Sequence, residues 1–194
     1  MRIATPARLT ATAAAAALMA SIAPAAHAAG DDTSARYSST SSVYGCTVTT
    51  DWTNAKTAFN FFVGKGLTKK QAAGVVGNFI AESGIDPKQY QCGGGPGRGI
   101  AQWERGSRWD TDYRDNMVWY AQAASQPSAW NLTPQLNFTW FELKTYSYYG
   151  LSSLKSTTTV KDATVSFMRN FERPGVEAID KRYDAAREVY FRFA

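Results

Sequence analysis

Apolar residues recur three and four positions apart through most of the chain after residue 50. Residues at that spacing lie on one face of an α-helix, so each run predicts a helix with one buried stripe. No segment shows a strong strand alternation, and no internal repeat is visible. The predicted fold class is mostly α, with a small hairpin or loop region after residue 84. The predicted helices span 53–66, 68–83, 112–125, 133–146, 158–171 and 173–193.

Each stripe identifies residues expected in the core. These are Ala55, Ala58, Phe59 and Phe62 in the first helix, Ala72, Val75, Val76 and Phe79 in the second, Leu136, Trp140 and Leu143 in the fourth, Val160, Ala163, Phe167 and Phe171 in the fifth, and Val176, Ile179, Tyr183, Ala186 and Tyr190 in the last. Gly64 and Gly66 are expected to end the first helix. Thr133 is the expected N-cap of the fourth, because Pro134 would then occupy the favoured first helical position.

The second predicted helix carries an acidic residue along its apolar stripe. Thr68 and Gln71 form a capping-box pattern at its start, and Gly84 is a natural residue just past its end. Three residues after Phe79, the stripe reaches Glu82. We therefore expect Glu82 to lie close to apolar surface in the last turn of this helix.

Burial near that surface would disfavour the charged form of Glu82 and raise its pKa. A carboxyl group that keeps its proton near neutral pH can protonate a leaving group, as glycoside hydrolysis requires. The segment that follows, 86–110, is rich in Gly and is predicted to be a loop that frames an open cleft. The alternative is that Glu82 turns to the rim and pairs with an arginine such as Arg98.

The loop also supplies two candidate ligand-binding side chains in the run GRGIAQW, residues 97–103. Gln102 carries an amide, which can hydrogen-bond to sugar hydroxyl and N-acetyl groups. Trp103 carries an indole, which can stack on a sugar face. A tryptophan in such a position can equally be a core residue. The run is not a phosphate-binding loop, because no Gly-Lys-Ser/Thr sequence follows it.

The run QAAGVVGNFIAESGIDP…GGGPGRGIAQW resembles the phage tail lysozyme domain, a member of the lysozyme-like superfamily. Glu82-Ser83 and Gly99-Ile100-Ala101-Gln102 are also similar, more distantly, to the Glu-Ser … Gly-Leu-Met-Gln pattern of soluble lytic transglycosylases and goose-type lysozymes. The later run FMRNFERPG, residues 167–175, looks like the C-terminal pattern of the phage family. The resemblance extends from about residue 54 to about residue 190.

This resemblance implies a lysozyme-like α+β fold that is mostly helical. It implies cleavage of the β-1,4 bond between N-acetylmuramic acid and N-acetylglucosamine. It places the general acid on Glu82, and substrate contacts on Gln102 and Trp103. Hydrolysis and a lytic transglycosylase reaction both stay open, as do retention and inversion. Nothing in the sequence points to a cofactor or a metal.

A second catalytic carboxylate is not identified by the sequence. Asp86, in an Asp-Pro turn, and Glu104, in a polar stretch, are the candidates, and each also has a structural interpretation. Glu142 and Glu172 are interpreted as structural ion-pair partners. Several members of the superfamily work with one essential glutamate, so a second acid is not required.

The N-terminal region has the order of a secretory signal peptide. Two arginines precede an apolar run too short to span a membrane, and Ala26-His27-Ala28 fits a small-x-small cleavage site. We assign residues 1–28 to the signal, 29–43 to a flexible Ser/Thr-rich leader and 44–194 to the lysozyme-like domain. The predicted location is secreted, at the cell wall.

Cleavage after residue 28 would remove the only histidine, His27. The mature chain would then contain no histidine, which excludes a Ser-His-Asp triad, a Cys-His pair and a His-ligated zinc site. In an exported chain, Cys46 and Cys92 are predicted to form a disulfide. That bridge would close a loop of about 45 residues, worth about 4 kcal/mol in the chain-entropy model.

Cleavage also removes two basic residues and no acidic ones, leaving a net charge of +3. The charge is spread along the chain, which does not favour a nucleic-acid partner. The expected partner is the bacterial cell-wall glycan, with no stable membrane association and a monomeric protein. Two alternatives stay open. One is a non-catalytic wall-binding module on the same fold, and the other is a chitin- or chitosan-degrading glycosidase.

Overall fold

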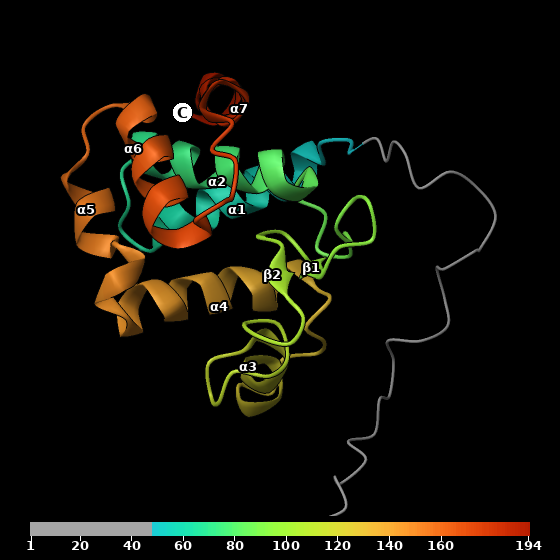
Figure 1. Cartoon of the computed structure of the whole chain (residues 1–194). Coiled ribbons are helices and arrows are strands. Elements are labelled where there is room, and N and C mark those ends of the chain that lie inside the picture. Colours follow the sequence, from blue (N-terminus) through green and yellow to red (C-terminus); the bar gives the residue numbers. More distant parts are fainter. Residues whose placement is uncertain (1–47) are drawn as a thin grey trace, which may run out of the picture. The chain divides into compact units, whose positions relative to one another are not determined.

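The structure, a computed structural model, describes residues 48–194. The predicted signal peptide, the leader and Cys46 lie outside the described residues. Within them, helices dominate and the strands form one short antiparallel hairpin, which confirms the mostly α fold class (Figure 1). The elements are α1 (Trp52–Gly64), α2 (Lys69–Ser83), β1 (Gly97–Arg98), β2 (Trp103–Glu104), α3 (Met117–Ala123), α4 (Leu132–Thr145), a 3-10 turn η1 (Ser147–Tyr149), α5 (Leu151–Ser156), α6 (Val160–Phe167), a π-helical segment η2 (Met168–Glu172) and α7 (Ile179–Phe193).

Helix α2 is enclosed by its neighbours. Nine consecutive residues, Gln71–Phe79, are buried, and α1, α6 and α7 all pack against them (Figure 1). The start of α2 is capped as predicted, because the Thr68 hydroxyl accepts from the Gln71 N–H and the Gln71 amide oxygen accepts from the Thr68 N–H. A helix buried on nearly every side positions its last turn firmly, and that turn carries Glu82.

Two glycines inside α2 explain how closely its neighbours approach. A Cβ atom at Gly74 would lie 2.7 Å from the Cβ of Ala163 in α6, and one at Gly77 would lie 2.5 Å from the Cβ of Ala186 in α7. Glycine in a helix interior costs up to about 1 kcal/mol relative to alanine. The close packing of three helix backbones offsets that cost.

Gly77→Ala is therefore expected to destabilise the protein. The added methyl group has no room against Ala186, and overpacking of this kind costs about 1–3 kcal/mol. In a domain of this size the midpoint of thermal unfolding, Tm, falls by about 2–4 °C for each kcal/mol. Gly64→Ala is the matched control, because nothing lies within 4 Å of a Cβ there. Equal Tm values for the two variants would contradict the packing argument.

Most of the predicted core positions are confirmed. The four residues named in α1 and the four in α2 are buried. Also buried are Leu136, Leu143, Ala163, Phe167, Phe171 and Ala186. Partly buried are Trp140, Val160, Ile179, Tyr183 and Tyr190.

The start of the last helix was predicted too early. Val176, an expected core residue, is 80% exposed, and α7 begins only at Ile179. Ala178 has a left-handed backbone (φ 44°), which a right-handed helix cannot include, so the segment after Pro174 stays irregular. The buried residues of α7 are Arg182, Ala186 and Val189.

Other helices also differ from the predicted pattern. Thr133 is not an N-cap, because α4 begins at Leu132 after Asn131. Pro134 still lies in the first turn, where its missing N–H leaves no hydrogen bond unmade. Helix α3 is shorter than the predicted 112–125, since Asn116 caps it and accepts from the Trp119 N–H. Helix α5 was not predicted, because its six residues are too few to show a period.

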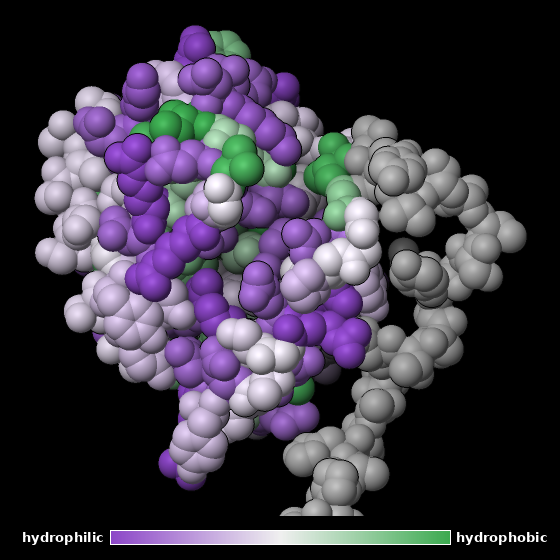
Figure 2. Space-filling view, viewed as in Figure 1, coloured by the Kyte–Doolittle hydropathy of each residue, from purple (hydrophilic) through white to green (hydrophobic). Residues whose placement is uncertain are grey.

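The surface in view is mostly hydrophilic, with apolar residues in small separate patches (Figure 2). Among residues 48–194, no helix combines the length and the apolar character that crossing a membrane demands.

Candidate active site

Glu82 lies in the last turn of α2 at the wall of a groove of about 410 Å³. Its side chain is 19% exposed, and its Oε1 lies 2.5 Å from Nη2 of Arg182. The carboxylate of Glu82 is thus paired with an arginine, which was the alternative interpretation of the sequence. The partner is Arg182 on α7 and not Arg98. Arg98 instead donates to the carbonyl oxygens of Gly95 and Gly97. The groove is lined by Val48, Ala81, Glu82, Gln91, Cys92, Gln102 and Lys181.

Arg182 is a buried cation that fixes the orientation of Glu82. Only 5% of its side chain is exposed. Its Nη1 donates to Oδ1 of Asn78 (3.1 Å), and its Nε donates to the Glu177 carbonyl oxygen (2.8 Å). Asn78 is itself held, because its amide nitrogen donates to the carbonyl oxygens of Gly74 and Thr164. The guanidinium therefore has little freedom to move away from the carboxylate.

Ser83 joins the end of α2 to the loop that forms the other wall. Its hydroxyl lies 2.9 Å from the Ile100 carbonyl oxygen and 3.1 Å from that of Phe79, and it accepts from the Ile85 N–H. Gly84 ends the helix in a left-handed conformation (φ 65°), as predicted. A side chain there would meet the Thr49 carbonyl oxygen at 2.3 Å. The Glu-Ser-Gly sequence thus fixes how the chain leaves the helix beside the groove.

The loop is held from the other side by Gln135 of α4. The buried amide of Gln135 accepts from the Ile100 N–H (2.8 Å) and donates to the carbonyl oxygens of Pro87 and Ala129. Gly99 packs so closely on this amide that a Cβ atom would lie 2.6 Å from it. Position 99 requires glycine for two reasons: its backbone is left-handed (φ 70°), and a side chain would collide with the Gln135 amide.

Gln102 lines the same groove as Glu82. Its backbone has φ 50°, and its amide nitrogen donates to the carbonyl oxygens of Gly99 (2.9 Å) and Gln89 (3.3 Å). Because the nitrogen is already used, the group that Gln102 can offer to a ligand without rearrangement is its carbonyl oxygen.

Trp103 points into the core and not into the groove. Its side chain is 1% exposed, and its ring packs on Phe138 with centroids 5.5 Å apart. Its Nε1 donates to Oε2 of Glu142 (3.1 Å). The indole has no exposed face on which a sugar could stack, so its visible role is to hold a buried carboxylate.

Glu142 is the ion-pair partner that the sequence predicted. Arg108 donates to both of its oxygens, from Nε to Oε1 (2.8 Å) and from Nη2 to Oε2 (2.9 Å). Burial alone would lower the pKa of Arg108, but the charge and hydrogen bonds of Glu142 raise it above its ordinary value. The guanidinium also lies over the rings of Tyr149 and Phe171. This network ties α4 to the loop after β2.

Glu172 differs from the prediction of a structural ion pair. Among the described residues it makes no ion pair, and its buried Oε1 accepts no hydrogen bond. Burial and then the negative charge of Glu82 raise the pKa of Glu172 well above its usual range, while Arg182 and Arg108 oppose the shift. The signal for this residue in the sequence is its place in the run FMRNFERPG.

The two other candidate carboxylates have structural positions. Asp86 accepts from the Lys88 N–H (2.8 Å) in the turn after α2. Glu104 is exposed on β2, where its carbonyl oxygen accepts from the N–H groups of Ser107 and Trp109. Neither residue lines the groove beside Glu82. In the part of the chain that the structure covers, no three His, Cys, Asp or Glu side chains gather as a metal site would require.

A sequence model of the phage tail lysozyme family matches residues 53–193. A comparison with curated proteins finds no similar sequence. The matched region includes every residue of the groove except Val48.

Proposed function

Because this chain belongs to the phage tail lysozyme family, which indicates a lysozyme-like peptidoglycan hydrolase, we propose that it cleaves the β-1,4 bond between N-acetylmuramic acid and N-acetylglucosamine. In this proposal Glu82 is the general acid. The observation that supports it is that Glu82 and Gln102, from the two separate motifs of the resemblance, line one groove.

The proposed reaction needs one proton on Glu82. Glu82 donates that proton to the glycosidic oxygen while the bond from this oxygen to the anomeric carbon breaks. Water then adds to the anomeric carbon and returns a proton to the carboxylate of Glu82, so the cycle closes. Capture by an internal hydroxyl of the sugar in place of water would give the lytic transglycosylase product.

We further propose that the protein is exported and acts as a monomer on the cell wall. The signal-like order of residues 1–28 supports export. The net charge of +3 in the mature chain suits a polyanionic wall.

The test of this function is mass spectrometry of purified peptidoglycan after incubation with the protein. Reducing-end muropeptides are the expected products, and anhydro-muropeptides would identify a lytic transglycosylase. Release of chitin oligomers without wall fragments would support the chitinolytic alternative. Binding to the wall without release from either polymer would support the non-catalytic module.

Gln102→Ala is expected to lower kcat/KM for wall cleavage by about 10-fold or more, because an oriented ligand contact is lost. The variant also loses the hydrogen bonds that the Gln102 amide donates to the carbonyl oxygens of Gly99 and Gln89, so its Tm is expected to fall by a few degrees. Assays well below that Tm separate the two effects. Gln122→Ala, at an exposed position of α3, is the control. A Gln102→Ala variant with a lower Tm and wild-type kcat/KM would assign Gln102 a structural role only.

A further inference from the structure

Lys181 is the other charged residue on the wall of the groove that holds Glu82. It lies in the first turn of α7, directly before Arg182. Its Nζ donates to the carbonyl oxygen of Ala81 (2.9 Å), the residue before Glu82 in α2. This contact places the ammonium group beside the last turn of α2, at the same end of the helix as the proposed acid. The reaction proposed for Glu82 makes no use of this charge.

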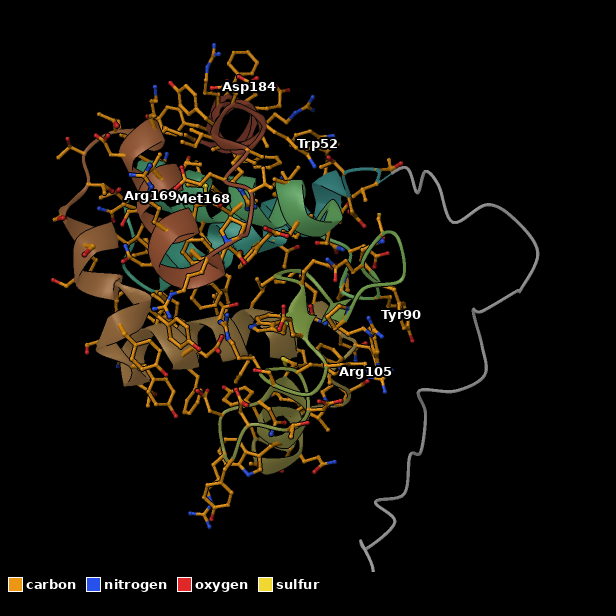
Figure 3. All side chains as sticks on the ribbon, in the orientation of Figure 1. Trp52, Tyr90, Arg105, Met168, Arg169 and Asp184 are labelled. Atoms are coloured by element: carbon orange, nitrogen blue, oxygen red, sulfur yellow. The ribbon has the colours of Figure 1, made fainter. Side chains whose placement is uncertain are left out.

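The protein does not neutralise the ammonium group of Lys181. Its side chain is exposed, and no carboxylate of the described residues lies within ion-pair distance of it. The acids about one turn away are paired elsewhere. Asp184, labelled in Figure 3, pairs with Arg187. Glu177 pairs with Arg169. The charge of Lys181 is therefore available to a ligand.

The contact with Ala81 accounts for only part of what the side chain can do. An ammonium group has three N–H donors. One of them satisfies the Ala81 carbonyl oxygen, which lies in the last turn of α2 and has no acceptor role within the helix. The other two make no hydrogen bond with the described residues. Stabilisation of the helix end thus leaves two donors and a full positive charge facing the groove.

The groove as a whole presents one uncompensated positive charge. Glu82 and Lys181 are the charged residues among those that line it. The charge of Glu82 is balanced by Arg182, which lies behind it with 5% of its side chain exposed. The charge that remains is that of Lys181. A groove of this kind favours a ligand that carries an anionic group.

We propose that Lys181 binds a carboxylate of the substrate and so selects wall glycan over other amino-sugar polymers; this inference rests on the proposed function. Muramic acid carries a lactyl group that N-acetylglucosamine lacks. The lactyl group ends in a carboxylate or bears a peptide stem with carboxylates of its own. Chitin is neutral, and chitosan carries amines that Lys181 would repel. Gln102 can accept from an acetamido N–H, which wall glycan and chitin share, so of these two residues Lys181 distinguishes the polymers.

The first test compares kcat/KM on soluble glycan strands in two forms, with their carboxylates intact and with these converted to amides. Wild type is expected to cleave the intact strands about 3- to 10-fold more efficiently, and added salt should reduce that ratio. Lys181→Met should show no preference, and Lys181→Arg should keep it. Each variant is compared with itself on two substrates, so a change in stability does not affect the ratio.

Lys155→Met, which removes an exposed lysine of α5 that does not line the groove, is the control and should keep the wild-type ratio. A wild-type protein that cleaves both forms equally well would overturn the proposal. So would a Lys181→Met variant that keeps the wild-type preference, because Lys181 would then have only its structural contact with Ala81.

A third form of the strands identifies the carboxylate. Removal of the peptide stems with an amidase leaves the free lactyl carboxylate on each muramic acid. If wild type still cleaves these stripped strands several-fold better than Lys181→Met does, the contact is with the lactyl group. If that advantage is confined to strands with stems, the contact is with a stem carboxylate. Either result supports a charge contact at Lys181.

A binding measurement separates this proposal from the proposed function. The Kd for intact and amidated strands is measured in Glu82→Gln, which is expected to bind without cleaving, and in the same variant with Lys181→Met added. If wild type releases no wall fragments, the proposed function fails. A several-fold tighter Kd for intact strands that disappears with Lys181→Met would still support the contact. Equal Kd values for the two forms in Glu82→Gln would overturn it.

Discussion

Replacement of Glu82 by Gln is expected to lower the rate of wall cleavage by about 10²- to 10⁴-fold, the contribution of a general acid. Gln keeps the shape of the side chain and can still accept from Arg182, but it cannot supply a proton. Arg182 retains its contacts to Asn78 and the Glu177 carbonyl oxygen. Because the buried guanidinium loses its charged partner, the free energy of unfolding should fall by about 1.5–3 kcal/mol, at about 2–4 °C in Tm for each kcal/mol.

The measurement is release of soluble muropeptides per unit time, with Tm recorded on the same samples. Glu188→Gln removes the same charge from an exposed glutamate on α7 and should keep wild-type activity. A Glu82→Gln variant that cleaves at the wild-type rate would remove Glu82 from the mechanism. Loss of activity together with a large fall in Tm would show that the change acts through the fold.

The largest effect on stability is expected for Glu142→Ala. The carboxylate has no exposed surface, and it accepts two hydrogen bonds from Arg108 and one from Trp103. Truncation leaves a partly buried guanidinium and a buried indole N–H without their acceptor. Breaking one partner of a buried pair costs about 3–5 kcal/mol. With about 2–4 °C for each kcal/mol, the Tm should fall by about 6–20 °C.

Glu188→Ala is the matched control, because it removes a glutamate that is paired with an arginine at the surface. Such exposed pairs contribute about 0–1 kcal/mol, so its Tm should stay close to wild type. Thermal unfolding followed by circular dichroism measures both variants. If they unfolded at the same temperature, the network of Arg108, Glu142 and Trp103 would not stabilise the fold.

The helices were predictable where local chemistry determines them. The capping box of Thr68 and Gln71, the apolar stripe of α1 and the glycine after Ser83 are properties of a few neighbouring residues, and all three are confirmed. The start of α7 was not predictable in the same way. The positions of Val176 and Ile179 fit the helical period, but the helix cannot include Ala178, whose backbone is left-handed. The spacing of apolar residues carries no information about the backbone angle of a single residue.

The candidate site was predictable only in part. The motifs of the resemblance pointed to Glu82 and Gln102, and both line the groove. Trp103 was a candidate for stacking on sugars, but tryptophan is equally suited to a protein core. Its indole lies in the core because Glu142 accepts its N–H and Phe138 packs against its ring, and both come from a distant helix. Glu172 was interpreted as one more ion-pair partner, because a sequence does not show how many cations reach a carboxylate.

The sequence by itself determined the helical class, the caps of α2 and the placement of an acidic residue at the end of a buried helix, since these follow from spacing along a few turns. Only the tertiary structure decided that Arg182, one hundred residues away, pairs with Glu82, and that Arg108 is already occupied by Glu142. Electrostatic interactions depend on distance and burial in space, so these two ion pairs exist only once α2 has packed on α7 and the loop after β2 has packed on α4.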